Sequence, residues 1–272
     1  MMIPVASAPT NHRVGEGAFV LAAGLLACAT IIVSPSSELS ARTLMTGVAL
    51  AVLVLTAVLG QSAPALRAAM VVSTMFVIFT VGAWVGAGPA VTTVAVSALP
   101  LLVLVLLQRR STWWPALPWL CVGRLGPLTW GLAAATVLGA GAGLTAFAVV
   151  VRPEVSSYLL SLRSLPWWIA VVGVVGFAVV NPVWEELLYR GVLQTELAAT
   201  VGARPAITAQ ALLFGLSHLH GFPSGWLGVA MASTWGFALG VIRLRTGGLV
   251  IPYLAHVVAN LTIGALAVVL LR

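Results

Sequence analysis

The 272-residue sequence contains no aspartate and no lysine, so its six acidic residues are all glutamates and its thirteen basic residues are all arginines. Without aspartate, the chain cannot form a catalytic aspartate pair, and it has no aspartate to orient a histidine beside a serine nucleophile. The G-x-S-x-G motif of many serine hydrolases is also missing. An aspartic protease site is therefore excluded, and a serine protease site is disfavoured.

Cysteine is almost as scarce. Cys28 lies inside an apolar stretch and Cys121 lies in a polar loop, so we expect no disulfide between them. The sequence has no C-x-x-C pair and no haem-attachment pattern, which leaves no cysteine-based metal or redox motif.

Charge of either sign is scarce as well. Only 7% of the residues are charged and 61% are hydrophobic, with a mean hydropathy of +1.11, whereas a soluble domain carries about 25% charged residues. The apolar runs are long and show no alternating ten-residue pattern, which favours helices over a β-barrel. The composition thus predicts an all-α polytopic membrane protein.

The apolar runs predict a bundle of about nine transmembrane helices, with eight or ten as alternatives. Each run is close to the roughly 20 residues that a helix needs to cross the hydrocarbon core. The first is longer than the core of a signal peptide, so we expect it to be a retained span. The predicted spans are 17–34, 43–60, 67–87, 89–107, 127–150, 166–188, 204–220, 224–242 and 248–271.

The longest polar break, residues 108–126, predicts two parts: residues 1–126, with four spans of unknown role, and residues 127–272, with the remaining five. Loops on the side of the N-terminus carry eight arginines and those on the other side carry four, which predicts a cytoplasmic N-terminus and an extracytoplasmic C-terminus. The two sets are Arg13, Arg67, Arg109, Arg110, Arg124, Arg204, Arg243 and Arg245, and Arg42, Arg152, Arg163 and Arg272.

These loop arginines point to anionic lipid headgroups as partners rather than to nucleic acid. Tryptophans flank several spans, as residues that anchor a helix at the membrane interface do. The flanking tryptophans are Trp113, Trp114, Trp119, Trp167 and Trp168.

A third of the acidic residues lie together near the end of the sixth predicted span, as Glu185 and Glu186. Ionisable residues inside a membrane segment are unfavourable and usually functional. Glu186 and Arg190 are four residues apart, so we expect them to pair on one helix face. Glu185 points about 100° away and remains available for another role. Pro182 removes a backbone hydrogen bond and predicts a kink just before them.

Two later spans carry strong polar groups at the same spacing. Phe214 and His218 are four residues apart near the end of the seventh span, and His256 and Asn260 are four apart inside the last span. His220, next to a turn, is expected to be an ordinary interfacial histidine. Unsatisfied polar groups in hydrocarbon are costly, so the three sets are expected to meet in one cavity. The expected topology complicates this meeting, because it places His218 at the opposite end of its span from Glu185.

In chain order, "EELLYR", "FGLSH" and "HVVAN" resemble the three motifs of the CAAX prenyl endopeptidase family, also called CPBP intramembrane proteases. The resemblance covers roughly residues 160–271 and implies a catalytic transmembrane core with an intramembrane endopeptidase activity. It implies catalytic roles for Glu185, His218, His256 and Asn260, supported by Glu186, Arg190 and Phe214.

Two mechanisms remain open for such a site. In one, His218, His256 and Glu185 bind Zn²⁺ and a metal-bound water attacks the peptide bond. In the other, no cofactor is needed: Glu185, helped by His218, activates the water, and His256 and Asn260 stabilise the oxyanion. The absence of H-E-x-x-H and the poor zinc affinity expected of an asparagine favour the second.

Two other classes of function remain as alternatives: a non-catalytic membrane scaffold or sensor with the same fold, and an ion- or proton-coupled transporter. No internal repeat is visible, which disfavours a transporter. All three motifs are complete, which disfavours a scaffold. The expected partners are membrane lipids and a membrane-associated or lipidated protein or peptide substrate.

Overall fold

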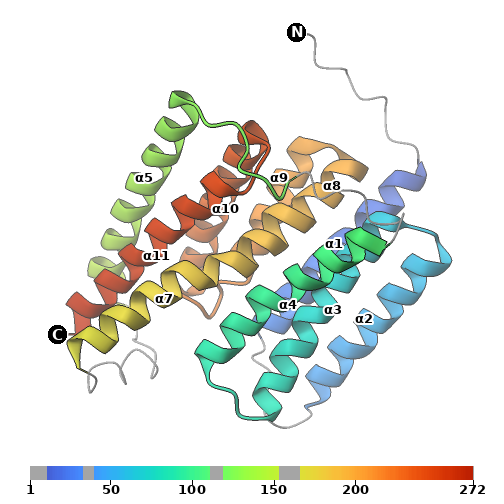
Figure 1. Ribbon diagram of the computed structural model, residues 1–272, viewed down its shortest axis with the longest axis horizontal. Helices are drawn as coiled ribbons and strands as arrows, with labels where there is room; N and C mark the ends of the chain where they lie inside the picture. The colour runs from blue at the N-terminus through green and yellow to red at the C-terminus, as the bar shows by residue number, and fades with distance from the viewer. Residues whose placement is uncertain (1–10, 33–39, 111–118, 153–165, 272) are drawn as a thin grey trace.

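The computed structural model describes residues 11–32, 40–110, 119–152 and 166–271, and within these ranges the regular elements are all helical (Figure 1). This confirms the predicted class, an all-α polytopic membrane protein. The elements are α1 (Asn11–Ile32), α2 (Ala41–Leu59), α3 (Ala63–Trp84), α4 (Pro89–Arg110), α5 (Pro127–Val151), α7 (Trp167–Glu185), the π-helix η2 (Glu186–Leu193), α8 (Gln194–Val201), α9 (Ala203–Leu216), α10 (Gly225–Thr246) and α11 (Val250–Leu271).

Each of the nine predicted spans contains a helix, which agrees with the predicted helical bundle. Among the described residues, seven helical segments are long and apolar enough to cross a membrane. One of them joins α7, η2 and α8 into a single run, 167–201, much longer than the predicted 166–188. In α1 the apolar stretch is shorter, residues 15–31. With 14 residues, α9 is about 21 Å long at 1.5 Å per residue, less than the thickness of the hydrocarbon core.

The early end of α9 creates a break inside the bundle. Residues 217–220, which the hydropathy pattern assigned to a span, form a turn, and α10 begins at Gly225 with a positive φ of 71°. Gly215 lets α9 and α10 approach closely, since a Cβ there would lie 2.6 Å from the carbonyl oxygen of Val229. Irregular backbone at membrane depth is tolerated where protein buries it or where it lines a cavity.

The N-terminal helices pack directly on the second half of the chain: α1 lies against α8 and α9, α3 against α8, and α4 against α7 (Figure 1). Arg67 of α3 forms a two-pronged ion pair with Glu196 of α8, with Nε–Oε1 and Nη2–Oε2 distances of 2.7 and 2.5 Å. The two predicted parts of the chain therefore share an extensive interface, and α1 reaches the central cavity through Ile31.

The described part of the long polar break also packs on the bundle. Trp119 is only 3% exposed, and its ring covers Gly191 of η2, where a Cβ would lie 2.8 Å from a ring carbon. The prediction that Trp119 is an interfacial anchor is therefore wrong. Because Gly191 has no side chain, the indole ring of Trp119 packs directly against the backbone of η2. Trp167 and Trp168 are exposed, as an interfacial position requires.

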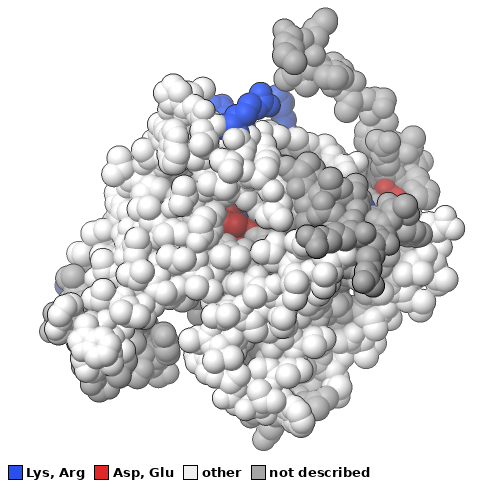
Figure 2. All heavy atoms as spheres, in the orientation of Figure 1, with Lys and Arg blue, Asp and Glu red and all other residues white. Residues whose placement is uncertain are grey.

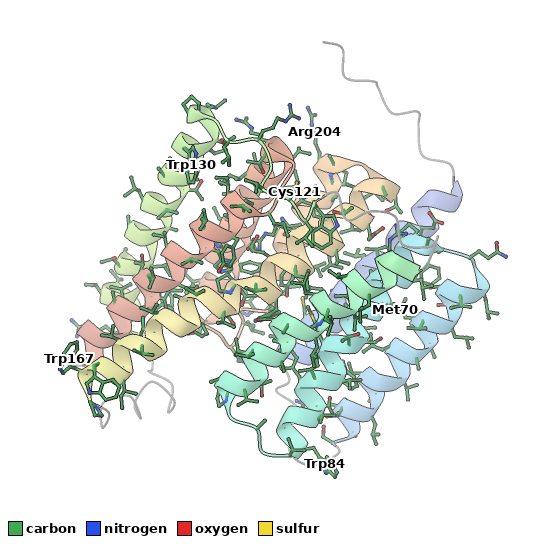
Figure 3. All side chains as sticks on the ribbon, in the orientation of Figure 1. Met70, Trp84, Cys121, Trp130, Trp167 and Arg204 are labelled. Atoms are coloured by element: carbon green, nitrogen blue, oxygen red, sulfur yellow. The ribbon has the colours of Figure 1, made fainter. Side chains whose placement is uncertain are left out.

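Arginines gather at one end of the bundle, at the upper edge of Figure 2, and Figure 3 places Arg204 at this end and Trp84 and Trp167 at the other. The start of α1 and the end of α11 lie at opposite ends (Figure 1). The membrane orientation of these ends remains a prediction. Trp113, Trp114, Arg163, Arg272 and the side chains of Arg13, Arg109 and Arg110 lie outside the described residues.

Candidate active site

The two neighbouring glutamates lie where α7 changes into a π-helix. Pro182 has no backbone N–H, and the N–H of Glu186 is shared between the carbonyls of Pro182 and Val183. From there the hydrogen bonds lengthen by one residue, as in the bond from the N–H of Gln194 to the carbonyl of Tyr189. The kink at Pro182 was expected from the sequence, but the π-helix was not foreseen. Such segments are rare and often lie at functional sites.

Glu186 is the buried centre of an ion-pair cluster. Its Oε1 accepts hydrogen bonds from Arg190 Nη1 at 2.9 Å and from His256 Nδ1 at 2.8 Å. The exposed fractions of Glu186 and Arg190 are 2% and 0%. The guanidinium also stacks on the ring of Phe214, with its Cζ 4.4 Å from the ring centroid. The predicted pairing of Glu186 and Arg190 is thus present, and Phe214 holds the arginine from the other side.

We expect Glu186→Gln to destabilise the protein by about 3–5 kcal/mol, because it leaves the guanidinium of Arg190 buried without a counter-charge. Thermal unfolding of the purified variant in detergent measures this. The double variant Glu186→Gln/Arg190→Met should regain part of the loss, since it removes both charges. A Glu186→Gln variant of unchanged stability that lacks activity would instead show that Glu186, and not Glu185, is the catalytic carboxylate.

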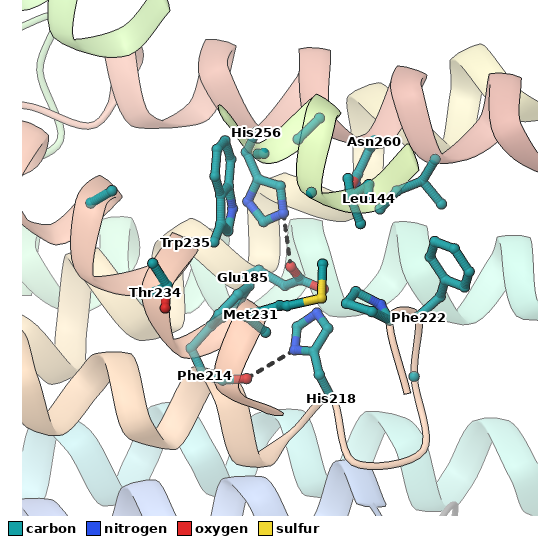
Figure 4. Close-up of a pocket in the computed structure, with 18 of the residues that line it drawn as sticks. Leu144, Glu185, Phe214, His218, Phe222, Met231, Thr234, Trp235, His256 and Asn260 are labelled. Atoms are coloured by element: carbon teal, nitrogen blue, oxygen red, sulfur yellow. Dashed lines mark hydrogen bonds and ion pairs between the residues drawn. The ribbon is translucent and has the colours of Figure 1, made fainter. Parts of the chain in front are cut away.

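His256 lies between the two glutamates. Its Nδ1 faces Glu186, and its Nε2 is 3.3 Å from Oε2 of Glu185 (Figure 4). A carboxylate oxygen only accepts, so the short Nδ1 contact assigns a proton to that nitrogen. Glu185 is 8% exposed and lines the cavity, whereas Glu186 does not. The structure therefore gives the two adjacent carboxylates different surroundings, one open to the cavity and one enclosed.

His218 approaches Glu185 from the turn after α9. The short α9 ends level with Glu185, which removes the difficulty that the predicted full-length span created. The ring Nδ1 lies 2.9 Å from the carbonyl oxygen of Phe214, which only accepts, so Nδ1 carries the proton. In the neutral imidazole with this tautomer, Nε2 has a free lone pair.

Asn260 contributes an unpartnered donor. Its side chain is 4% exposed and lines the same cavity as His256, one helical turn away. The side-chain N–H₂ group, Nδ2, has no hydrogen-bond partner among the residues that the structure describes. A buried donor without a partner is unfavourable by about 1–3 kcal/mol. Such a donor is suited to a bound group that supplies an acceptor.

The cavity that these residues share has a volume of about 730 Å³. Glu185, His218, His256 and Asn260 all line it, and Figure 4 shows their side chains directed toward a common space. The remaining walls are mainly apolar and come from α5, α7, α10 and α11. The size fits a peptide segment or another ligand with a large apolar part.

Three polar side chains near this cavity were not singled out as site residues from the sequence. Asn181 donates to Oε1 of Glu185 at 2.8 Å, and Trp184 donates to Asn181 at 3.0 Å. Trp235 places its ring edge-on to His256, with centroids 6.0 Å apart. The spacing of Asn181 and Glu185, four residues apart, was a signal that could have found the first contact. His220 is exposed and does not line the cavity.

The donor set does not fit a zinc ion. Within the described ranges, no three or more His, Cys, Asp or Glu side chains are grouped so that they can hold a metal. His218 directs its protonated Nδ1 at a backbone carbonyl, and both ring nitrogens of His256 face carboxylates. Both ring nitrogens of His256 are thus engaged with other protein groups, whereas His218 keeps the lone pair of Nε2.

Comparison with known proteins matches the same part of the chain. Residues 166–262 match the family model of type II CAAX prenyl endopeptidase, Rce1-like. The uncharacterized protein YpbD of Bacillus subtilis (strain 168) is 31% identical over 106 residues, which are 39% of this chain and 48% of the relative. The chain thus spans about half the length of the curated relative that it matches. No solved structure matches the chain.

The matched segment contains all three motifs and confirms the resemblance seen in the sequence. It extends from the beginning of α7 into α11, so it includes every polar side chain of the cavity described above. The helices α1 to α5 lie outside it.

Proposed function

Since residues 166–262 match the Rce1-like endopeptidase family, we propose that the protein is an intramembrane endopeptidase. Its substrate is a membrane-associated protein or peptide, and the apolar walls of the cavity suit a lipidated one. The observation that carries the proposal is the cavity itself. It brings together a carboxylate, a histidine whose Nδ1–H points at a backbone carbonyl so that Nε2 can accept, and a buried amide donor without a partner among the described residues.

Glu185 is the proposed general base. Its carboxylate and the Nε2 lone pair of His218 each accept a hydrogen bond from one water molecule, which fixes the water between them. Transfer of a proton to Glu185 lets the water oxygen attack the carbonyl carbon of the substrate. Glu185 then returns that proton to the nitrogen of the departing amine, so that the peptide bond breaks and the base is regenerated.

Asn260 is the proposed main oxyanion donor. The carbonyl oxygen of the substrate gains negative charge during the attack, and the amide Nδ2 is placed to donate to it. His256, one turn away on the same helix face, keeps its protonated Nδ1 on Glu186, and its Nε2 supplies a second donor only when that nitrogen is protonated as well. None of these steps requires a metal ion.

The proposal is tested by cleavage in proteoliposomes with a quenched-fluorescent peptide that carries a farnesylated CAAX tail, together with the same peptide without the lipid. We expect cleavage by the wild type after treatment with EDTA and removal of the chelator, and none by Glu185→Gln. Activity that disappears with EDTA and returns with stoichiometric zinc would contradict the mechanism. Failure to cleave either peptide, with a folded protein, would favour the scaffold or sensor alternative.

A further inference from the structure

We propose that Asn181 and Trp184 form a positioning relay that holds the carboxylate of Glu185, and that the N-terminal helices anchor this relay through α3. The proposal rests on the proposed function, because it concerns the orientation of the proposed general base. Neither Asn181 nor Trp184 belongs to the three motifs, and the second half of the chain alone does not account for the contacts of Trp184.

The chemistry of the three groups allows only one direction for the relay. An indole N–H only donates and a carboxylate only accepts, whereas an amide side chain does both. Trp184 Nε1 donates to Asn181 Oδ1 at 3.0 Å, and Asn181 Nδ2 donates to Glu185 Oε1 at 2.8 Å. The indole thus fixes the amide with its N–H₂ group toward the glutamate.

Each oxygen of the Glu185 carboxylate then faces a defined neighbour. Oε1 accepts from Asn181, and Oε2 faces His256 Nε2 at 3.3 Å. A carboxylate whose Oε1 is held by a hydrogen bond and whose Oε2 lies against the His256 ring cannot rotate freely, so the atom that receives the proton keeps a constant position. Since rates depend steeply on such placement, a shift of about 1 Å is enough to lower a rate by about 10²-fold.

The relay ends in the N-terminal half of the protein. Trp184 is 6% exposed, and its ring packs edge-on against Phe79 of α3, with centroids 6.0 Å apart and an interplanar angle of 82°. Next to it, Ser97 of α4 donates to the carbonyl of Val180 at 3.1 Å. Two helices outside the matched segment therefore fix the turn of α7 that carries the relay, which gives these spans a role in the site.

The test uses purified full-length protein and the farnesylated quenched-fluorescent peptide. We expect Asn181→Leu to lower kcat by about 10- to 100-fold with KM nearly unchanged, because it removes the group that orients the base. Trp184→Phe should act in the same direction, since it keeps the ring packing on Phe79 and removes only the N–H. The double variant should be no slower than the slower single variant, as expected for members of one relay.

Tyr253→Phe is the matched control. The Tyr253 hydroxyl donates to the carbonyl of Val179 at 3.0 Å, so this variant loses a hydrogen bond to the same region of α7 without touching the relay. We expect a lower melting temperature and an unchanged kcat. If Asn181→Leu behaves like Tyr253→Phe, with reduced stability and normal kcat, the relay is overturned and Asn181 is only a packing residue.

A second measurement does not depend on activity. Asn181→Leu should lower the melting temperature of the wild type, and should lower it much less in a Glu185→Leu background, where the acceptor is already missing. Equal losses in both backgrounds would overturn the relay whatever the activity. Coupled losses together with a wild type that cleaves neither peptide would overturn the proposed function alone.

Discussion

Replacing Glu185 by glutamine is expected to lower kcat by about 10²- to 10⁴-fold, with little change in KM, because a neutral amide cannot take a proton from water. The substitution keeps the size of the side chain and its carbonyl oxygen, which still accepts from Asn181 Nδ2 at the position of Oε1. Folding should therefore be preserved. Single-turnover cleavage of the farnesylated peptide and thermal unfolding on the same preparation measure both quantities.

Glu196→Gln is the control for this experiment. It removes a charge of the same kind at a buried glutamate of the 167–201 span that pairs with Arg67 and does not line the cavity. We expect it to alter stability and leave kcat unchanged. A Glu185→Gln variant that cleaves at the wild-type rate would show that another group deprotonates the water.

Asn260→Ala is expected to lower kcat by about 10²- to 10³-fold with little change in KM, in line with the loss of other oxyanion donors. The amide nitrogen has no hydrogen-bond partner in the described part of the chain, so removing it breaks no hydrogen bond seen there. The main effect should thus appear only when the oxyanion forms, which lowers kcat without weakening substrate binding. The measurement is the single-turnover rate constant.

The variant Asn260→Asp tests whether the donor character of the Asn260 side chain, and not its shape, is what matters. It has nearly the same shape, but a carboxylate would repel the oxyanion, so we expect a rate at least as low as that of Asn260→Ala. The alternative is that Asn260 only joins helices, as polar residues in membrane bundles often do. In that case the alanine variant would melt at a lower temperature and retain its rate per folded molecule.

The helical segments, and the pairs of site residues that share a helix face, were predictable because both depend on residues close together in the sequence. Long apolar runs identified the helical segments, and the four-residue spacings of Glu186 with Arg190 and of His256 with Asn260 identified groups that share a face. These spacings depend only on helix geometry. The convergence of Glu185, His218, His256 and Asn260 on one cavity then follows from the need of buried polar groups for partners.

The early end of α9 and the burial of Trp119 were not predictable, because they depend on contacts between segments that are distant in the sequence. Residues 204–220 are apolar throughout much of their length, and hydropathy alone does not show that α9 stops at Leu216, where the close approach to α10 and the cavity determine the turn. The burial of Trp119 depends on Gly191, 72 residues further along the chain. The π-helix has a weak local signal in Pro182, but most helices with an internal proline do not change their hydrogen-bond pattern in this way.

The close spacing of the charge partners in α7 and η2 bears on how this segment enters the membrane during synthesis. A single Arg at the centre of an inserting helix is unfavourable by about 2.5–3.5 kcal/mol, and an unpaired Glu there is unfavourable as well. His256, the partner of Glu186 on α11, is made 70 residues later. Arg190 and Asn181, by contrast, lie within four residues of the glutamates that they contact. The nascent helix thus enters the bilayer with its own counter-charge and hydrogen-bond donor. These local partners stabilise the two glutamates in the membrane before α11, which carries His256, is synthesised.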